Sequence, residues 1–124
     1  MSKPSSAPKA RIPADRSAFY DALIATVPEI ERKGAAMAYT SLNGNMFSYM
    51  NTDGVLALRL GPADRESFIA RYGACLHQAY GIVQKEYVAV PDALLADTDE
   101  LRPHFAASHR YAQTLRPKPT KKAR

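Results

Sequence analysis

Residues 46–50 and 55–60 are short, mostly apolar segments, the second with leucine at every other position, and a further mostly apolar segment, 35–42, precedes them. A period of two is typical of β-strands, whose successive side chains point to opposite faces of a sheet. Two turn sequences separate the segments, Asn-Gly at 43–44 and Asn-Thr-Asp-Gly at 51–54. Residues of these types favour hairpin turns. The pattern therefore predicts an antiparallel meander of three strands at the centre of the fold.

The alternation also predicts which side chains share a face of this meander. Leu56, Leu58 and Leu60 share one face of the last strand. That face has to be covered, because a row of exposed leucines on a strand promotes aggregation. We therefore expect it to lie under helices. The middle strand places two sets of side chains on opposite faces: Phe47 and Tyr49, and Met46, Ser48 and Met50.

Apolar residues recur every three or four positions before the meander, which is the spacing of a helix. We expect this helix from about residue 16 to residue 26, with Asp15 or Ser17 as its N-cap. Pro28 ends it, because the residue before a proline disfavours the helical conformation. The apolar stripe comprises Phe19, Leu23, Ile24 and Val27.

Two further helices are predicted after the meander. Gly61-Pro62 begins the second helix, since proline is favoured at the first helical position, and Gly73 is a typical C-cap. Asp97 with Glu100 three residues later is the capping-box pattern that begins the third. Pro103 indicates that this helix starts close to it, because proline is tolerated only near the first turn. The apolar seam of the third helix is Leu101, Phe105, Ser108, Ala112 and Leu115.

The remaining segments complete the predicted fold. Residues 74–83 are ambiguous, residues 84–90 predict a strand that Pro91 ends, and residues 92–96 predict a single helical turn. The expected fold class is α+β. It consists of an antiparallel sheet of about five strands with helices packed on one face, in the order α-β-β-β-α-β-β-α.

Composition indicates one domain with charged ends. The 124 residues carry a net charge of +5 and are 46% hydrophobic. Residues 17–115 hold eight bases and eleven acids, whereas residues 116–124 hold five bases and no acid. We expect a disordered basic arm at 1–14, a folded domain at 15–116 and a disordered basic tail at 117–124.

Several functional classes have no support in the residues. The single cysteine cannot form an internal disulfide, and the N-terminus lacks the apolar segment of a secretory signal. No apolar run approaches the roughly 20 residues of a membrane span. Because of the single cysteine, a cytoplasmic protein is expected. The chain contains no phosphate-binding loop, dinucleotide fingerprint, nucleophile elbow or zinc motif. We therefore expect a non-enzymatic protein without cofactor or metal.

The cysteine and the histidines are the residues with catalytic potential. Cys75 lies two residues before His77, and a cysteine beside a histidine can act as a nucleophile. A buried, unreactive thiol is the commoner role of a free cysteine and the one we favour. His104 and His109 lie five apart, whereas helical zinc pairs lie four apart, so solvent-exposed histidines are expected there. A small Cys/His enzyme is a third hypothesis of low weight.

Two sets of side chains on the predicted strands are candidates for binding. The aromatic set can line a pocket or stack on single-stranded nucleic acid. Cross-strand pairing within the sheet is favoured instead, because Arg and Lys do not interleave with these rings. The methionines fit either the core or an adaptable partner surface, and both interpretations are open. The two sets are Tyr39, Phe47, Tyr49, Tyr80 and Tyr87, and Met37, Met46 and Met50.

The basic tail is a candidate for contacts with phosphates. Such contacts make binding to nucleic acid strongly salt-dependent. A solubilising tail is the alternative and the commoner role of terminal charge runs. The candidate phosphate contacts are Arg116, Lys118, Lys121, Lys122 and Arg124.

Four residue strings occur in a characteristic order: NGNM at 43–46, LALRLGP at 56–62, YVAVP at 87–91 and AQTLRPK at 112–118. Together they resemble the N-terminal domain of the TfoX/Sxy family, over about residues 16–120. The resemblance implies a secretion-chaperone-like α+β fold, no cofactor, no established enzymatic activity and no catalytic residue. Larger relatives are competence and transcription regulators with a second domain, so a regulatory role carries over only in general terms.

Two positions depart from the family pattern. Many members carry Met-Phe-Gly-Gly at the first strand, where Lys33 is followed here by Gly-Ala-Ala-Met, and many have Trp where this chain has Phe105.

The leading hypothesis is a non-enzymatic regulatory or protein-interaction domain that binds a protein, including a second copy of itself, through a sheet face or edge. The alternative is a nucleic-acid accessory protein that binds phosphates through its basic N- and C-terminal tails.

Overall fold

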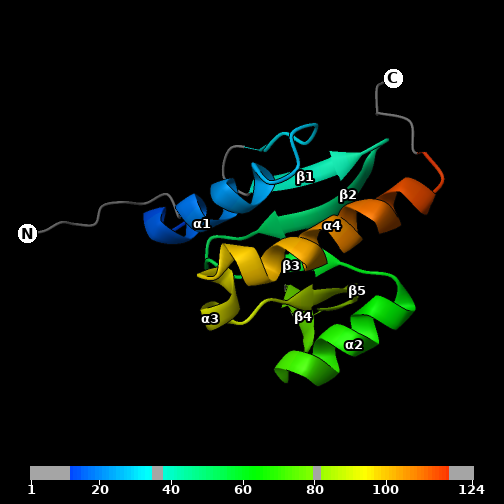
Figure 1. The fold of residues 1–124 in the computed structure, drawn as a ribbon. Coiled ribbons are helices and arrows are strands. Elements are labelled where there is room, and N and C mark those ends of the chain that lie inside the picture. Colours follow the sequence, from blue (N-terminus) through cyan, green and yellow to red (C-terminus); the bar gives the residue numbers. More distant parts are fainter. Residues whose placement is uncertain (1–11, 35–37, 80–81, 118–124) are drawn as a thin grey trace, which may run out of the picture.

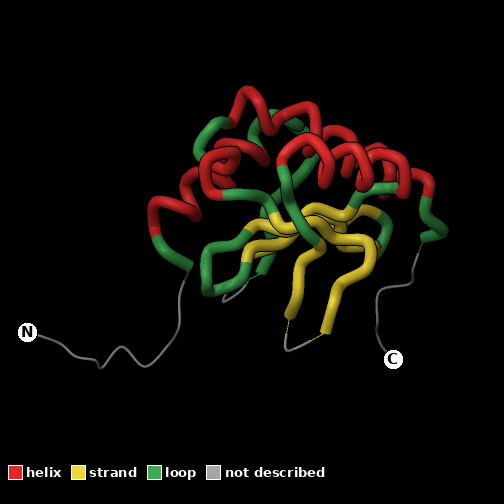
Figure 2. The backbone as a smooth tube through the Cα atoms, turned by 90° about the horizontal axis from the view of Figure 1, so that it is seen from below, coloured by secondary structure: helices red, strands yellow, loops and turns green. Residues whose placement is uncertain are grey.

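A five-stranded antiparallel sheet with helices on one face forms the protein (Figure 1). The computed structural model describes residues 12–34, 38–79 and 82–117. Strand order is β1-β2-β3-β5-β4, and Figure 2 shows the helices gathered on one side of the sheet. The predicted fold class and element order are confirmed, and a short helix forms at the expected helical turn. The elements are α1 (Ala14–Ile24), β1 (Ala38–Leu42), β2 (Asn45–Met50), β3 (Leu56–Arg59), α2 (Pro62–Tyr72), β4 (Leu76–Ala79), β5 (Ile82–Ala89), α3 (Asp92–Leu95) and α4 (Thr98–Thr114).

Both turns of the meander form where the sequence predicts them. Asn43 and Gly44 have φ angles of 54° and 82°, the positive values that a two-residue hairpin turn requires. In the second turn, Gly54 has a φ of 81° and Asn51 Oδ1 accepts hydrogen bonds from the amides of Asp53 and Val55. The Asn side chain therefore satisfies two backbone donors inside the turn.

Helix α1 begins and ends two residues earlier than predicted. Pro13 is its N-cap, and the expectation of Asp15 or Ser17 is wrong. The proline carbonyl accepts the first helical bond from the Ser17 amide at 2.9 Å, while the Ser17 hydroxyl accepts a bond from Arg32. Proline suits this position because its φ is fixed, here at −53°. Tyr20, which the predicted stripe omitted, is fully buried.

The ends of α2 and the start of α4 follow their capping signals. Pro62 is the first residue of α2, and Gly73 closes it in the left-handed conformation. Asp97 accepts a hydrogen bond from the Glu100 amide at 3.2 Å and so caps α4. The prediction that α4 begins near Pro103 is wrong, since the helix begins at Thr98 and continues through the proline. Pro103 removes one helical hydrogen bond on the exposed side, and burial of the opposite face outweighs that cost.

A β-bulge in β2 changes which side chains face the helices. Thr40 pairs with Ser48 and Ser41 with Met46, so Phe47 is an additional residue on β2. Phe47 and Ser48 therefore both lie on the helix side of the sheet, where Phe47 packs on Phe105 of α4. The prediction that Phe47 shares a face with Tyr49 is wrong for this reason, as is the pairing of Met46 with Met50.

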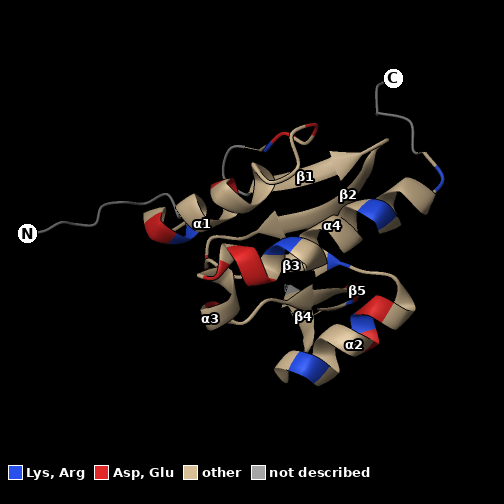
Figure 3. Cartoon of the chain, in the orientation of Figure 1, with Lys and Arg blue, Asp and Glu red and all other residues tan. Residues whose placement is uncertain are grey.

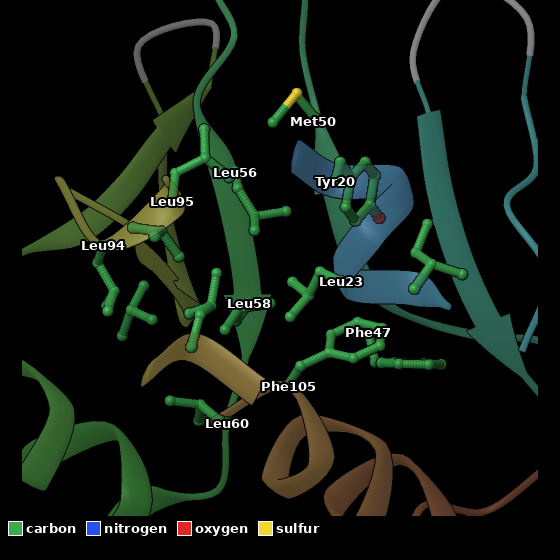
Figure 4. Close-up of a cluster of buried hydrophobic side chains, with 14 of the residues drawn as sticks. Tyr20, Leu23, Phe47, Met50, Leu56, Leu58, Leu60, Leu94, Leu95 and Phe105 are labelled. Atoms are coloured by element: carbon green, nitrogen blue, oxygen red, sulfur yellow. The ribbon is translucent and has the colours of Figure 1, made fainter. Parts of the chain in front are cut away.

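The main core lies between the sheet and the helices (Figure 4). Leu56, Leu58 and Leu60 are at most 1% exposed there, which confirms the predicted leucine face. A buried polar chain crosses this core: the Tyr20 hydroxyl is 2.6 Å from Ser48 Oγ, which is 2.5 Å from Thr40 Oγ1. Each hydroxyl therefore has a partner, so the burial of these polar groups is compensated.

Candidate interaction surfaces

The side of the sheet without helices carries a second, smaller cluster, made of Tyr49, Ala57 and Tyr87 with Tyr39 and Met46 packed against it. The rings of Tyr49 and Tyr87 lie 5.3 Å apart, and both residues are buried. Burial raises the pKa of Tyr87 to about 12, so the phenol remains protonated. The two rings pack together from β2 and β5, on either side of β3, so they belong to the packing of the sheet and do not form an open stacking platform. Tyr80 lies outside the described residues.

His77 of β4 completes this second cluster. Its Nδ1 lies 2.6 Å from the Tyr49 hydroxyl, and its ring packs edge-on against the Tyr49 ring. Burial lowers the pKa of His77, which Asp53 opposes only in part, so the neutral imidazole is favoured. The histidine therefore serves as a packed, hydrogen-bonded member of the sheet surface.

Arg59 closes the same side of the sheet near the bulge. Its Nε donates to Glu86 Oε1 at 2.6 Å, and the guanidinium lies over the rings of Tyr87 and Tyr111. Burial alone would raise the pKa of Glu86, but the hydrogen bond and charge of Arg59 outweigh it and lower the pKa. The Met46 carbonyl accepts from both Tyr87 and Arg59. These contacts satisfy the backbone at the bulge.

Of the candidate methionines, the two within the described residues, Met46 and Met50, lie on opposite faces of the sheet. Met50 is fully buried in the main core, so of the two interpretations left open by the sequence the core one applies to it. Met46 lies on the opposite face and packs against the second cluster. Met37 lies outside the described residues. The bulge separates Met46 from Met50, and sequence periodicity gives no sign of it.

Cys75 and His109 both differ from their predicted environments. Cys75 is exposed, because it lies in the short link between α2 and β4. Within the described residues, no hydrogen bond joins its side chain to a histidine. His109 is buried, with its ring 5.6 Å from that of Phe47, because α4 packs directly on β2. The expectation of a solvent-exposed His109 is therefore wrong.

His104 lies between α4 and α2 in a polar cluster. The Tyr72 hydroxyl donates to Glu100 Oε2 at 2.6 Å and lies 2.9 Å from His104 Nε2. Because the phenol proton goes to the carboxylate, His104 Nε2 is the donor to the phenol oxygen. Burial, assisted by Arg71, lowers the pKa of His104. Across the described ranges, no group of three or more His, Cys, Asp or Glu side chains is placed to hold a metal ion.

The hairpin of β4 and β5 carries the exposed large hydrophobic side chains of the described chain. Ile82 is 64% and Val83 43% exposed. Strand β3 pairs with β5 at residues 87–89, whereas Ile82 and Val83 pair with β4 alone. Figure 2 shows these two strands extending away from the sheet, on the side opposite the helices. Residues 74–83, ambiguous in sequence, thus contribute β4 and begin this hairpin.

Of the candidate phosphate contacts, Arg116 lies within the described residues, exposed just after α4. Its carbonyl accepts a hydrogen bond from Asn45 Nδ2 at 2.9 Å, which ties the end of α4 to the start of β2. Lys118, Lys121, Lys122 and Arg124 lie outside the described residues.

No protein-family model matches the chain, and no curated protein or solved structure shows significant similarity to it. The resemblance to the TfoX N-terminal domain stays a prediction from the residue strings quoted above. Among the helices in the described ranges, none has the length and apolar character needed to cross a membrane.

Proposed function

We propose that this protein is a non-enzymatic interaction domain that associates with a second copy of itself through the β4–β5 hairpin. The exposure of Ile82 and Val83 is the observation that carries the proposal. Full burial of one such side chain contributes about 1.5–3 kcal/mol. The resemblance to the TfoX N-terminal domain adds a regulatory role to this proposal.

The hairpin also offers unpaired backbone groups. Strand β4 is at the edge of the sheet, and residues 82–85 of β5 extend beyond the end of β3. Neither side of the hairpin is therefore fully used in strand pairing within the described chain. Open strand edges pair readily with another strand, and natural edges usually carry charges or prolines that prevent this. No Asp, Glu, Lys, Arg or Pro occurs between residues 72 and 84.

A second copy of the chain is the partner that these features fit. A strand that pairs antiparallel with its own copy is related to it by a two-fold axis, the commonest symmetry of homo-oligomers. Each copy then contributes the same apolar side chains to the contact. Residues 73–83 carry no charge, and Lys85 is the one charged residue of the open stretch 82–85, so like charges meet only if the axis passes at Lys85.

The test is the mass of the full chain in solution, measured by sedimentation equilibrium over a range of concentrations. We expect a dimer for the native chain and a monomer for the double variant Ile82→Thr, Val83→Thr, which keeps β-branched side chains in the strand. Val55→Thr is the matched control, because Val55 is partly exposed at the opposite turn and should leave the dimer unchanged. A native chain that stays monomeric at every concentration contradicts the proposal, as does a double variant that dimerises normally.

A further inference from the structure

Strand β4 contacts a strand that is not its neighbour in the sheet. Strands β3 and β5 lie between β4 and β2, and a spacing of about 4.8 Å per strand would separate β4 from β2 by about 14 Å in a flat sheet. The ring of His77 on β4 nevertheless lies 5.2 Å from that of Tyr49 on β2, and its Nδ1 is 2.6 Å from the Tyr49 hydroxyl. Figure 2 shows β4 and β5 turned towards the helix-free side, which brings the two side chains together. The contact therefore helps to fix the direction in which β4 leaves the sheet.

His77 lies at the point where the hairpin departs from the sheet. Before it, Leu76 pairs with Val88, in the part of β5 that also pairs with β3. After it, Gln78 pairs with Val83, which has no partner on β3. The register shifts between these two pairs, and such irregularities bend a strand. The side chain of His77 thus holds the bend of β4 against the helix-free side.

The position of the imidazole favours its neutral form. His77 is 4% exposed and packs edge-on against a phenol ring, so a positive charge there loses most of its hydration. Asp53 of the second turn opposes this effect only in part.

The other groups around His77 do not change charge where histidine does. Among the residue types present, only histidine ordinarily titrates between pH 5 and 8. The titratable and charged groups on the neighbouring strands and links are Tyr49, Asp53, Arg59, Cys75, Lys85, Glu86 and Tyr87. A change of charge near pH 6 at this bend therefore belongs to the imidazole.

We infer that His77 makes the association of two copies dependent on pH: protonation of the imidazole separates it from Tyr49, releases the β4–β5 hairpin and weakens the dimer. The inference rests on the proposed function, in which this hairpin joins the two copies. An imidazolium regains its water only if β4 moves away from the helix-free side. A released hairpin has to be ordered again on pairing, which costs binding free energy, and protonation in both copies places like charges at the interface. The dimer is thus favoured at neutral pH and weakened in mild acid.

The first experiment measures the dissociation constant of the full chain by sedimentation equilibrium at about pH 7.5 and 5.5. We expect the constant to rise by about tenfold or more at the lower pH, because each proton taken up on release can change the equilibrium about tenfold per pH unit. His77→Gln keeps a hydrogen-bonding side chain without the change of charge, so its constant should be the same at both pH values.

The matched control is His104→Gln, which removes another histidine whose pKa is lowered by burial, at the contact of α4 with α2. It should keep the pH dependence of the native chain. A native constant that does not change with pH overturns the inference. So does a His77→Gln chain that keeps the native pH dependence, or a His104→Gln chain that loses it.

The second experiment separates this inference from the proposed function and needs no variant. Hydrogen exchange is measured on the diluted native chain at the same two pH values and compared as protection factors, which remove the effect of pH on the chemical exchange rate. Protection of residues 76–79 is expected to fall in mild acid while the main core stays protected. Equal protection of residues 76–79 at both pH values overturns the release of the hairpin, even if the chain dimerises. A chain that is monomeric at every concentration but loses this protection in acid contradicts the proposed function alone and supports the release.

Discussion

The two faces of the sheet are covered in different ways. The helix side is closed by large aliphatic and aromatic side chains from β2, β3, α1 and α4, and its buried hydroxyl groups bond to one another or to backbone carbonyls (Figure 3 shows the charged residues outside this core). The opposite side has no helix over it and is closed by rings with polar atoms, Tyr49, His77 and Tyr87, beside the ion pair of Arg59 with Glu86. A sheet face can thus be completed by its own side chains, provided that their polar atoms find partners among themselves.

The β4–β5 hairpin differs from both of these covered faces. Both sheet faces are largely covered over the central strands, whereas the hairpin extends beyond them with Ile82 and Val83 exposed. We expect the helix side to supply most of the stability and the opposite side to depend on its polar contacts.

Truncation of a core aromatic residue should have the largest effect. Phe105→Ala removes a fully buried ring that packs on Phe47, and such changes cost about 3–5 kcal/mol in the free energy of unfolding. Tyr39→Ala on the opposite side should cost less, because Tyr39 is only partly buried. Urea denaturation of both variants measures the two losses. Equal losses would mean that the two faces contribute alike, contrary to the comparison.

Removal of a single tyrosine hydroxyl should destabilise the protein by different amounts on the two faces of the sheet. Tyr49→Phe leaves Nδ1 of the buried His77 without its partner and should cost about 1–3 kcal/mol. Tyr20→Phe on the helix side should cost about 0.5–1.5 kcal/mol, because Ser48 keeps its bond to Thr40. The same denaturation assay compares the two variants. A larger loss for Tyr20→Phe would contradict the dependence of the helix-free side on its polar pair.

The stability should also depend on pH through the histidines. Burial lowers the pKa of His77 and of His104, so below about pH 6.5 the unfolded chain binds more protons than the folded one. The free energy of unfolding is therefore expected to be highest above about pH 6.5 and to decrease as the pH falls below this value. Unfolding measured between about pH 7.5 and 5.5 should show a smaller loss for His77→Gln than for the native chain. An identical loss in the variant would exclude His77 as a contributor.

The ion pair at the bulge should give the smallest effect. Glu86→Gln removes the charge beside Arg59 but keeps a hydrogen-bonding group, and a partly exposed pair of this kind contributes about 0.5–1 kcal/mol. The loss should decrease with added salt, because exposed ion pairs are screened. Thermal unfolding at low and high salt provides the measurement, and a loss independent of salt would argue for a packing role of Glu86 instead.

The periodicity of the sequence predicts the fold well in strands and helices that no bulge interrupts. The leucines of β3 lie on the predicted face because their alternation is unbroken, and Gly73 and Asp97 cap their helices as predicted. Strand β2 differs, since the additional residue at Phe47 reverses the faces of its first half. A period of two cannot locate such a residue, because the bulge is defined by pairing with β1.

The candidate surfaces depend still more on tertiary packing. His109 is buried because α4 lies over β2, and Cys75 is exposed because it links α2 to β4. Neither environment follows from residue spacing. The exposure of Ile82 and Val83 depends on the lengths of the paired strands, since β5 extends beyond the end of β3.

Hydrogen exchange of the full chain, followed by mass spectrometry at low and high protein concentration, tests the central claim most directly. Pairing between two copies protects backbone amides at the hairpin, so exchange in residues 82–85 is expected to slow as the concentration rises. Exchange along the outer face of α4 and within the main core should not change. Equal exchange in residues 82–85 at both concentrations, or protection confined to another element, would contradict the proposal that the β4–β5 hairpin joins two copies of this protein.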